Sequence, residues 1–145
     1  MPLIQLVYIS AATQLHDDAT LTDLMQSSSV RNKSVDITGM LLYCDGFFIQ
    51  VLEGEESTVD AVFARILKDL RHKDVITILR GPIDERSFAH WSMGFRILAL
   101  GETKSHPAYA PLFTEGFAVE RFVARPGLAV ELLSEFGRSS PPPRP

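Results

Sequence analysis

Gln50 interrupts one of the most apolar stretches of the chain, the segment FFIQVLEG at residues 47–54. In a strand, Gln50 would lie between Phe48 and Leu52 on one face, while the residues of the other face are all apolar. A buried glutamine brings two N–H donors and a carbonyl acceptor, and an unpaired buried polar group costs about 1–3 kcal/mol. The amide of Gln50 therefore needs a partner.

Other polar residues are predicted to gather around Gln50 on the helix-covered side of a sheet. Tyr8 lies in the apolar segment LIQLVYIS at 3–10, which would form the strand next to that of Gln50. The remaining candidates lie on the two predicted helices, and apolar side chains separate them: Asn32, Arg65, Asp69 and His72, set among Leu24, Leu41, Phe48 and Ile66. A flat apolar slot with polar groups at its rim suits a heteroaromatic ring.

Each of these residues also has an ordinary structural explanation. A core tyrosine such as Tyr8 usually donates to a backbone carbonyl, and a strand glutamine is often an edge residue. Arg65 and Asp69 would form a common i, i+4 pair on a helix. Only the combination of these residues points to a ligand site.

The elements that would hold these residues follow the order β-α-β-β-α-β-β. We expect strands at 3–10, 37–43, 47–54, 75–80 and 91–98, with a hairpin turn at 44–46 and a break at Gly81-Pro82. Thr20 and Ser57 would cap the two helices, which would end near Ser34 and at the basic run 71–73. This order predicts an α+β, ferredoxin-like fold with an added strand and both helices on one face.

The opposite face of this sheet is predicted to be apolar as well. Its residues are Val7, Ile9, Met40, Leu42, Phe47, Ile49 and Val51. Soluble proteins rarely expose so large a patch, so helical segments at 107–113, 117–123 and 128–136 should cover it. The expected contacts are Phe113, Phe117, Phe122, Leu128, Leu132 and Phe136. We expect a main domain at 1–98, a C-terminal helical cap at 99–138 and a disordered Pro-rich tail at 139–145.

The composition excludes several other classes of protein. With 145 residues, 46% of them hydrophobic and 22% charged, one globular domain is expected. The net charge is −4 and basic residues form no stripe, which argues against a nucleic-acid partner. No apolar run is long enough to span a membrane, the one cysteine forms no internal disulfide, and the four histidines are not spaced as metal ligands. A cytoplasmic protein without a metal is the default expectation.

Five motifs in order make the chain closely similar to the BLUF family, the blue-light sensors that use flavin. They are LVYIS with Tyr8, Asn32 followed by ITGMLLY, FFIQVLEG with Gln50, RILKDLRHKDV, and WSMGF with Trp91 and Met93. The resemblance covers Leu3 to Leu98, so that residues 1–98 would be the flavin-binding photosensory domain.

The resemblance implies a role for each matching residue. Tyr8 would give an electron and a proton to the photoexcited ring, and Gln50 would bridge that phenol and the flavin N5 and C4 carbonyl. Trp91 and Met93 would exchange places as the signal reaches the fifth strand. The cofactor-binding residues would be Tyr8, Leu24, Ser28, Arg31, Asn32, Leu41, Phe48, Gln50, Arg65, Ile66, Asp69, Arg71, His72 and Met93. Arg31 departs from the relatives, which often carry Asn or His there. It either reaches the cofactor phosphate or lies in solvent.

The function that the resemblance implies is light sensing without catalysis. Excitation of bound flavin, FAD or FMN with FAD favoured, would rearrange the hydrogen bonds of Tyr8 and Gln50. The change would pass through the fifth strand to the C-terminal helices, and then to a separate signalling protein or a second copy of the chain. A homo-oligomer is expected.

Two functions from other classes are the alternatives. A hydrolase of the acylphosphatase type needs a Gly-rich phosphate loop after the first strand, whereas that segment here, SAATQLHDDAT, is acidic and has no glycine. An oligomeric scaffold would use the apolar outer face as its interface. Flavin colour on purification distinguishes both from a light sensor.

Overall fold

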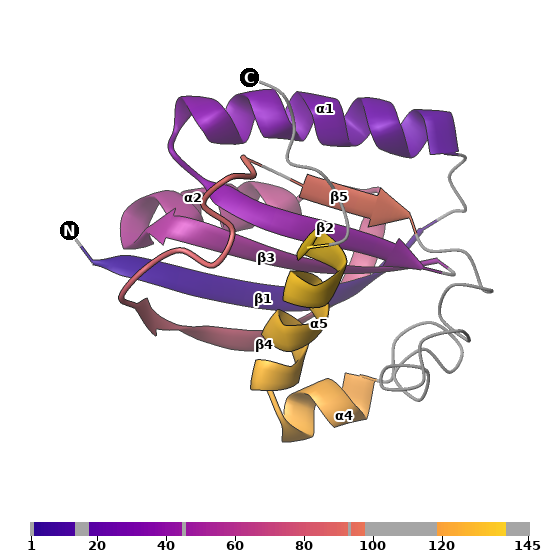
Figure 1. Cartoon of the computed structure of the whole chain (residues 1–145). Coiled ribbons are helices and arrows are strands. Elements are labelled where there is room, and N and C mark those ends of the chain that lie inside the picture. Colours follow the sequence, from indigo (N-terminus) through magenta and orange to yellow (C-terminus); the bar gives the residue numbers. More distant parts are fainter. Residues whose placement is uncertain (1, 14–17, 45, 93, 98–118, 139–145) are drawn as a thin grey trace.

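A single sheet organises the computed structural model, which describes residues 2–13, 18–44, 46–92, 94–97 and 119–138. The five strands lie in the order β4-β1-β3-β2-β5 (Figure 1). Their bounds are β1 Leu3–Ala12, β2 Thr38–Cys44, β3 Phe47–Glu55, β4 His72–Ile83 and β5 Gly94–Ile97. Neighbouring strands are antiparallel except β2 and β5, which are parallel. The predicted α+β, ferredoxin-like order with an added strand is confirmed.

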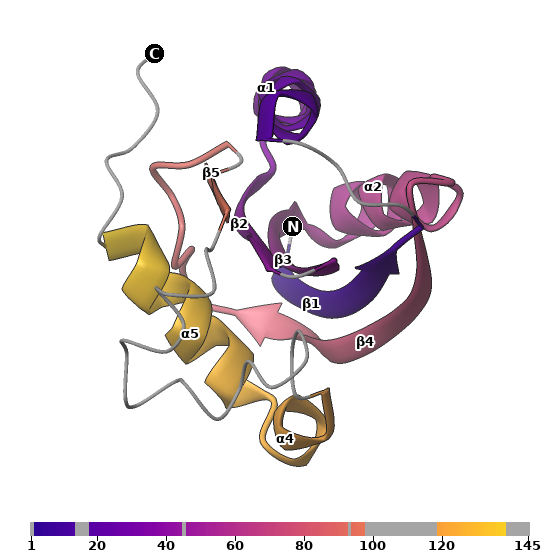
Figure 2. The same ribbon diagram turned by 90° about the vertical axis from the view of Figure 1, so that its right-hand side faces the viewer.

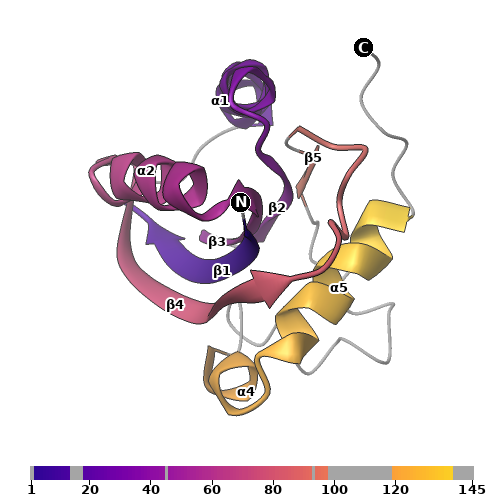
Figure 3. The ribbon, with the colours of Figure 1, turned by 90° about the vertical axis from the view of Figure 1, so that its left-hand side faces the viewer.

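Helices cover both faces of this sheet. The helices α1 (Asp18–Ser34) and α2 (Glu56–Leu67) lie on one face, and α4 (Val119–Ala124) and α5 (Gly127–Arg138) lie on the other, as Figures 2 and 3 show from opposite sides. Only Arg125 and Pro126 separate α4 from α5, close to the predicted gap between segments 117–123 and 128–136. None of the described helices is both long and apolar enough to cross a bilayer.

The alternation of side chains along the strands builds two separate cores. The inner core, under α1 and α2, contains Tyr8, Leu41 and Phe48. The outer core, under α4 and α5, contains all seven sheet residues predicted for that face, with Phe47 partly buried, and Phe122, Leu128 and Leu132 pack against them. Phe113 and Phe117 lie outside the described residues, as do segment 107–113 and the tail.

The second helix is shorter than predicted. It ends at Leu67, and the run 71–73 is not its last turn, because His72 already begins β4. A helix that continued to 71–73 would carry Leu67 and Leu70 on its apolar face, but these residues are 52% and 88% exposed. Strand pairing explains the difference, since β4 pairs with β1 along its whole length, from Leu3 opposite Ile83 to Ala12 opposite His72.

Both predicted N-terminal caps are wrong. The first helix begins at Asp18, before Thr20. The second begins at Glu56 directly after β3, so Glu55 is the N-cap and its side chain forms no capping hydrogen bond. Ser57 is therefore inside the helix.

Two strand boundaries also differ from the prediction. β4 continues through Gly81-Pro82 to Ile83 instead of breaking there. It lies at the edge of the sheet, where a proline without an N–H donor is tolerated. β5 begins at Gly94, so Trp91 precedes the strand rather than opening it. The predicted hairpin turn is consistent with the backbone at Gly46. Its φ is 82°, a value that glycine adopts without strain and other residues rarely adopt.

Candidate functional site

A pocket of about 410 Å³ opens between α1, α2 and the inner face of the sheet. Its floor comes from β1, β2 and β3 through Tyr8, Leu41, Phe48 and Gln50. Of the fourteen predicted cofactor-binding residues, thirteen line this pocket, and the fourteenth, Met93, lies outside the described residues. The residues predicted to share a site are therefore brought together around one cavity.

Tyr8 and Gln50 form the hydrogen bond at the bottom of the pocket. They stand opposite each other in the pairing of β1 with β3, and the Tyr8 hydroxyl donates to Oε1 of Gln50. Both side chains are about 95% buried or more. The sequence predicted that the buried amide of Gln50 needs a hydrogen-bond partner, and Tyr8 is such a partner.

The phenol of Tyr8 is held in its protonated form. Burial raises its pKa well above the ordinary value of 10, and the negative charge of Asp69 raises it further. The ring packs 5.5 Å from Phe63 between centroids, which contributes to this apolar environment. Tyr8 is thus a neutral O–H donor over the whole physiological pH range.

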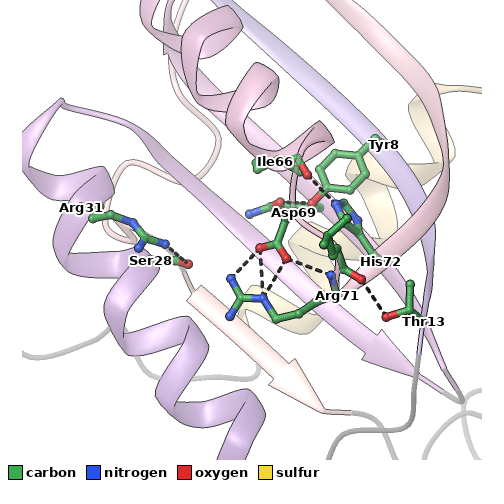
Figure 4. Close-up of polar contacts among 10 residues, drawn as sticks. Tyr8, Thr13, Ser28, Arg31, Ile66, Asp69, Arg71 and His72 are labelled. Atoms are coloured by element: carbon green, nitrogen blue, oxygen red, sulfur yellow. Dashed lines mark hydrogen bonds and ion pairs between the residues drawn. The ribbon is translucent and has the colours of Figure 1, made fainter.

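Asp69 and Arg71 form an ion pair at the rim (Figure 4). The Arg71 Nε atom lies 2.8 Å from Asp69 Oδ1, and the Arg71 backbone N–H donates to the same oxygen at 2.9 Å. Hydrogen bonds from Arg71 lower the pKa of Asp69 to about 2. The ordinary alternative, an i, i+4 helix pair of Arg65 with Asp69, does not apply, because α2 ends at Leu67 and Asp69 lies beyond it.

His72 connects the end of α2 to the floor of the pocket. Its Nε2 lies 2.6 Å from the carbonyl oxygen of Ile66, and its Nδ1 lies 2.7 Å from Oγ of Ser10. A carbonyl only accepts, so Nε2 carries the proton, and in the neutral imidazole the Ser10 hydroxyl donates to Nδ1. The ring is thereby fixed beside Tyr8, 6.0 Å away between centroids.

The α1 wall of the pocket carries both buried and exposed polar groups. Asn32 is 6% exposed and its carbonyl accepts the N–H of Ile37 at 2.9 Å, which secures the end of the helix. Arg31 lines the pocket but is exposed, and its Nη2 atom lies 3.3 Å from Oγ of Ser28 (Figure 4). Arg31 therefore stands at the mouth, between the cavity and solvent.

Trp91 lies on the other side of the sheet. It packs against the outer core, with its ring centroid 6.3 Å from that of Phe88. Gly94 makes this packing possible, because a Cβ atom there would lie 2.7 Å from both the Trp91 indole and the Met40 sulfur. Trp91 is thus absent from the residues that line the pocket.

Sequence reasoning missed several residues of the lining: Met25, Ser34, Val35, Thr58, Ala61 and Val62. Helical spacing could have found some of them, because Thr58, Ala61 and Val62 share one face of α2 with Arg65. Among the described residues, no group of three or more His, Cys, Asp or Glu could hold a metal ion.

Comparison with known proteins identifies the family of this fold and pocket. A family model described as BLUF, sensors of blue-light using FAD, matches residues 3–94, which is more than half of the chain. The chain belongs to the BLUF family. Residues 3–94 accordingly form a domain of a family of blue-light sensors, as the sequence motifs predicted.

Curated relatives carry the BLUF region as a small part of a larger protein. Photoactivated adenylate cyclase subunit alpha of Euglena gracilis is 42% identical over 86 residues, which are 59% of this chain and 8% of that protein. Photoactivated adenylate cyclase subunit beta of Euglena longa is 39% identical over 92 residues, 63% of this chain and 11% of that protein. The likeness therefore spans only a small part of each of these relatives.

Solved structures of a BLUF protein and of a light-regulated cyclase match nearly the whole of this chain. The dark-state structure of BlrB, a BLUF protein, has a TM-score of 0.72 at 30% identity and covers 92% of this chain and 93% of that one. A bacterial light-regulated adenylyl cyclase has a TM-score of 0.73 at 28% identity, covering 92% of this chain and 39% of that one. The BLUF identity does not support the hydrolase and scaffold alternatives.

Proposed function

We propose that the pocket between α1 and α2 binds the isoalloxazine ring of a flavin, with FAD favoured over FMN. The residues present fit such a group. The cavity of about 410 Å³ offers apolar walls from Leu24, Leu41 and Ile66 and amide groups from Asn32 and Gln50. A planar heteroaromatic ring needs this combination of apolar faces and a few fixed polar contacts.

The single observation that carries the proposal is the buried hydrogen bond from Tyr8 to Gln50. A bound flavin supplies blue-light absorption and an excited state that oxidises a nearby phenol. Tyr8 is suited to be the electron donor, because its O–H group already donates to Gln50 and can release its proton as the electron leaves. Gln50 has a donor and an acceptor on one planar group, so rotation or tautomerisation reverses its hydrogen bonds without moving bulk.

We propose that the altered Gln50 signals across the sheet through Trp91 and Met93 to α4 and α5. Trp91 already packs with the outer core, which includes Phe122 and Leu132 of these helices. Packed cores shift between discrete arrangements rather than deforming continuously, which favours a two-state output. The output would be a separate signalling protein or a second copy of the chain, and the chain itself would not be an enzyme.

We propose the same domain boundaries that the sequence suggested. Residues 1–98 would be the photosensory domain and 99–138 the cap that transmits the signal, whereas the predicted tail at 139–145 lies outside the described residues. The cytoplasmic location and the homo-oligomer remain predictions.

The proposal is tested by what the purified protein carries. We expect it to be yellow and to release FAD on denaturation, and its elution volume in size-exclusion chromatography to differ between darkness and blue light. Release of FMN would correct the favoured flavin only. A colourless protein that takes up neither flavin on refolding would overturn the proposed site.

A further inference from the structure

Glu53 is a completely buried carboxylate on the face of the sheet opposite the pocket. Its exposed fraction is 0%, and it lies three residues after Gln50 on β3. Its register partners on both neighbouring strands donate to it. Gln5 Nε2 lies 3.1 Å from Oε2, and Thr38 Oγ1 lies 3.1 Å from Oε1.

The same carboxylate also holds the segment that connects β4 to β5. The backbone N–H of Ser87 donates to Oε2 at 2.8 Å, and that of Phe88 donates to Oε1 at 2.9 Å. Four donors therefore satisfy the two oxygens of Glu53. Two of the donors are peptide groups of the segment that leads directly to Trp91.

Arg86 braces this arrangement from the solvent side. Its Nη1 atom donates to Thr38 Oγ1 at 2.9 Å and to the backbone carbonyl of Glu53 at 3.2 Å, while Nη2 lies 3.1 Å from Oδ2 of Asp36. The Arg86 side chain is only 14% exposed, whereas that of Asp36 is 91% exposed. The guanidinium thus ties the connecting segment to both β2 and β3.

The held segment enters the outer core. Phe88 is 1% exposed within it, and the carbonyl of Phe88 accepts the N–H of Trp91 at 3.0 Å. A chain of direct contacts therefore runs from β3 through the Glu53 carboxylate to the peptide of Phe88, and from there to Trp91. Hydrogen bonds to a charged acceptor are the stronger kind, so this link is stiff.

We propose that Glu53 is a positioning residue of the photoresponse, which couples β3 to segment 84–92 and so transmits the change at Gln50 to Trp91. The inference rests on the proposed function, because it concerns the route that the light signal takes. The carboxylate does no chemistry. It makes the connecting segment move with the strand that carries the photoactive amide.

The substitution Glu53→Gln tests this link with little change of shape. Whichever end of the new amide carries the NH₂ group, that group faces one peptide N–H, of Ser87 or of Phe88, which can only donate. The other partner at either end can adjust, because the Gln5 amide can flip and the Thr38 hydroxyl can rotate. One hydrogen bond between β3 and the connecting segment is therefore lost.

Trp91 is the only tryptophan of the chain, so its fluorescence reports on this position alone. We expect light to change the Trp91 emission of the parent protein, and E53Q to lose most of this change while its flavin red shift keeps its amplitude. Full retention of the emission change in E53Q would overturn the proposal. Val59→Ala is the matched control, because Val59 is fully buried on α2 and its truncation loosens the inner core without touching Glu53. An equal loss of the Trp91 emission change in this control would also overturn the proposal.

A second measurement needs no variant. Hydrogen exchange of the parent protein should show a light-dependent change at the amides of Ser87 and Phe88, and unchanged protection there would also overturn the coupling role of Glu53. The proposed function is tested separately, by the red shift of the flavin absorption. If the parent protein shows a normal red shift but no light-dependent exchange in segment 84–92, only the proposed route through Glu53 is refuted.

Discussion

Tyr8 and Gln50 occupy paired positions on adjacent antiparallel strands, and the phenol of one donates to the amide oxygen of the other. The bond lies at the floor of a cavity and is fixed by two strands of the sheet centre rather than by loops. This geometry leaves the amide of Gln50 as the group that can change its hydrogen bonds without a change in packing.

Removal of either member of this pair should abolish the red shift and leave flavin binding in place. Tyr8→Phe deletes the proton donor and Gln50→Leu deletes the switchable amide, while both keep the cavity filled. Absorption spectra before and after blue illumination measure the effect. Gln26→Leu, at an exposed glutamine of α1, is the control and should respond normally. A normal red shift in Y8F or Q50L would remove that residue from the mechanism.

The photoresponse should persist at alkaline pH, above the ordinary tyrosine pKa of 10, because burial and Asp69 raise the pKa of Tyr8. The same shift makes a stability prediction. The unfolded chain releases the phenolic proton first, so the free energy of unfolding is unaffected below pH 10 and declines as the pH rises above it. Urea unfolding across this range should show a smaller decline in Tyr8→Phe. An equal decline in both proteins would contradict the pKa shift.

Gly94→Ala should displace Trp91 without emptying the flavin pocket. The added methyl group would lie 2.7 Å from the indole and from the Met40 sulfur, closer than such contacts allow. We expect a shifted Trp91 emission in darkness and a changed rate of dark recovery, with the flavin absorption maximum unaltered. Gly81→Ala is the control, since a Cβ atom there meets nothing within 4 Å. An unchanged Trp91 emission in G94A would mean that the outer core absorbs the methyl group.

Truncation of the outer core should destabilise the protein strongly. Leu132 is completely buried on α5, so Leu132→Ala should lower the free energy of unfolding by about 2–5 kcal/mol, a large share of the stability of a domain. Val123→Ala, on the neighbouring α4, removes a side chain that is 56% exposed and should change little. Chemical denaturation compares them. Equal, small effects would show that α5 contributes little to the fold.

The sequence predicted the order of the elements and the two apolar faces, because both follow from local alternation along the strands. It also placed Tyr8 beside Gln50, since the fold class makes their strands neighbours. The end of α2 was wrong because β4 pairs with the whole of β1, which is a tertiary preference that helical spacing does not reveal. The hydrogen bonds of Glu53 were missed for a similar reason: its four donors come from three separate segments, β1, β2 and the connection between β4 and β5.

The absorption spectrum of the purified protein, recorded in darkness and after blue illumination, tests the central claim most directly. We predict an oxidised flavin band that moves to the red by a small amount and returns in darkness, because the Tyr8–Gln50 pair rearranges reversibly. A flavin that bleaches permanently, or whose spectrum does not respond to light, would contradict the account.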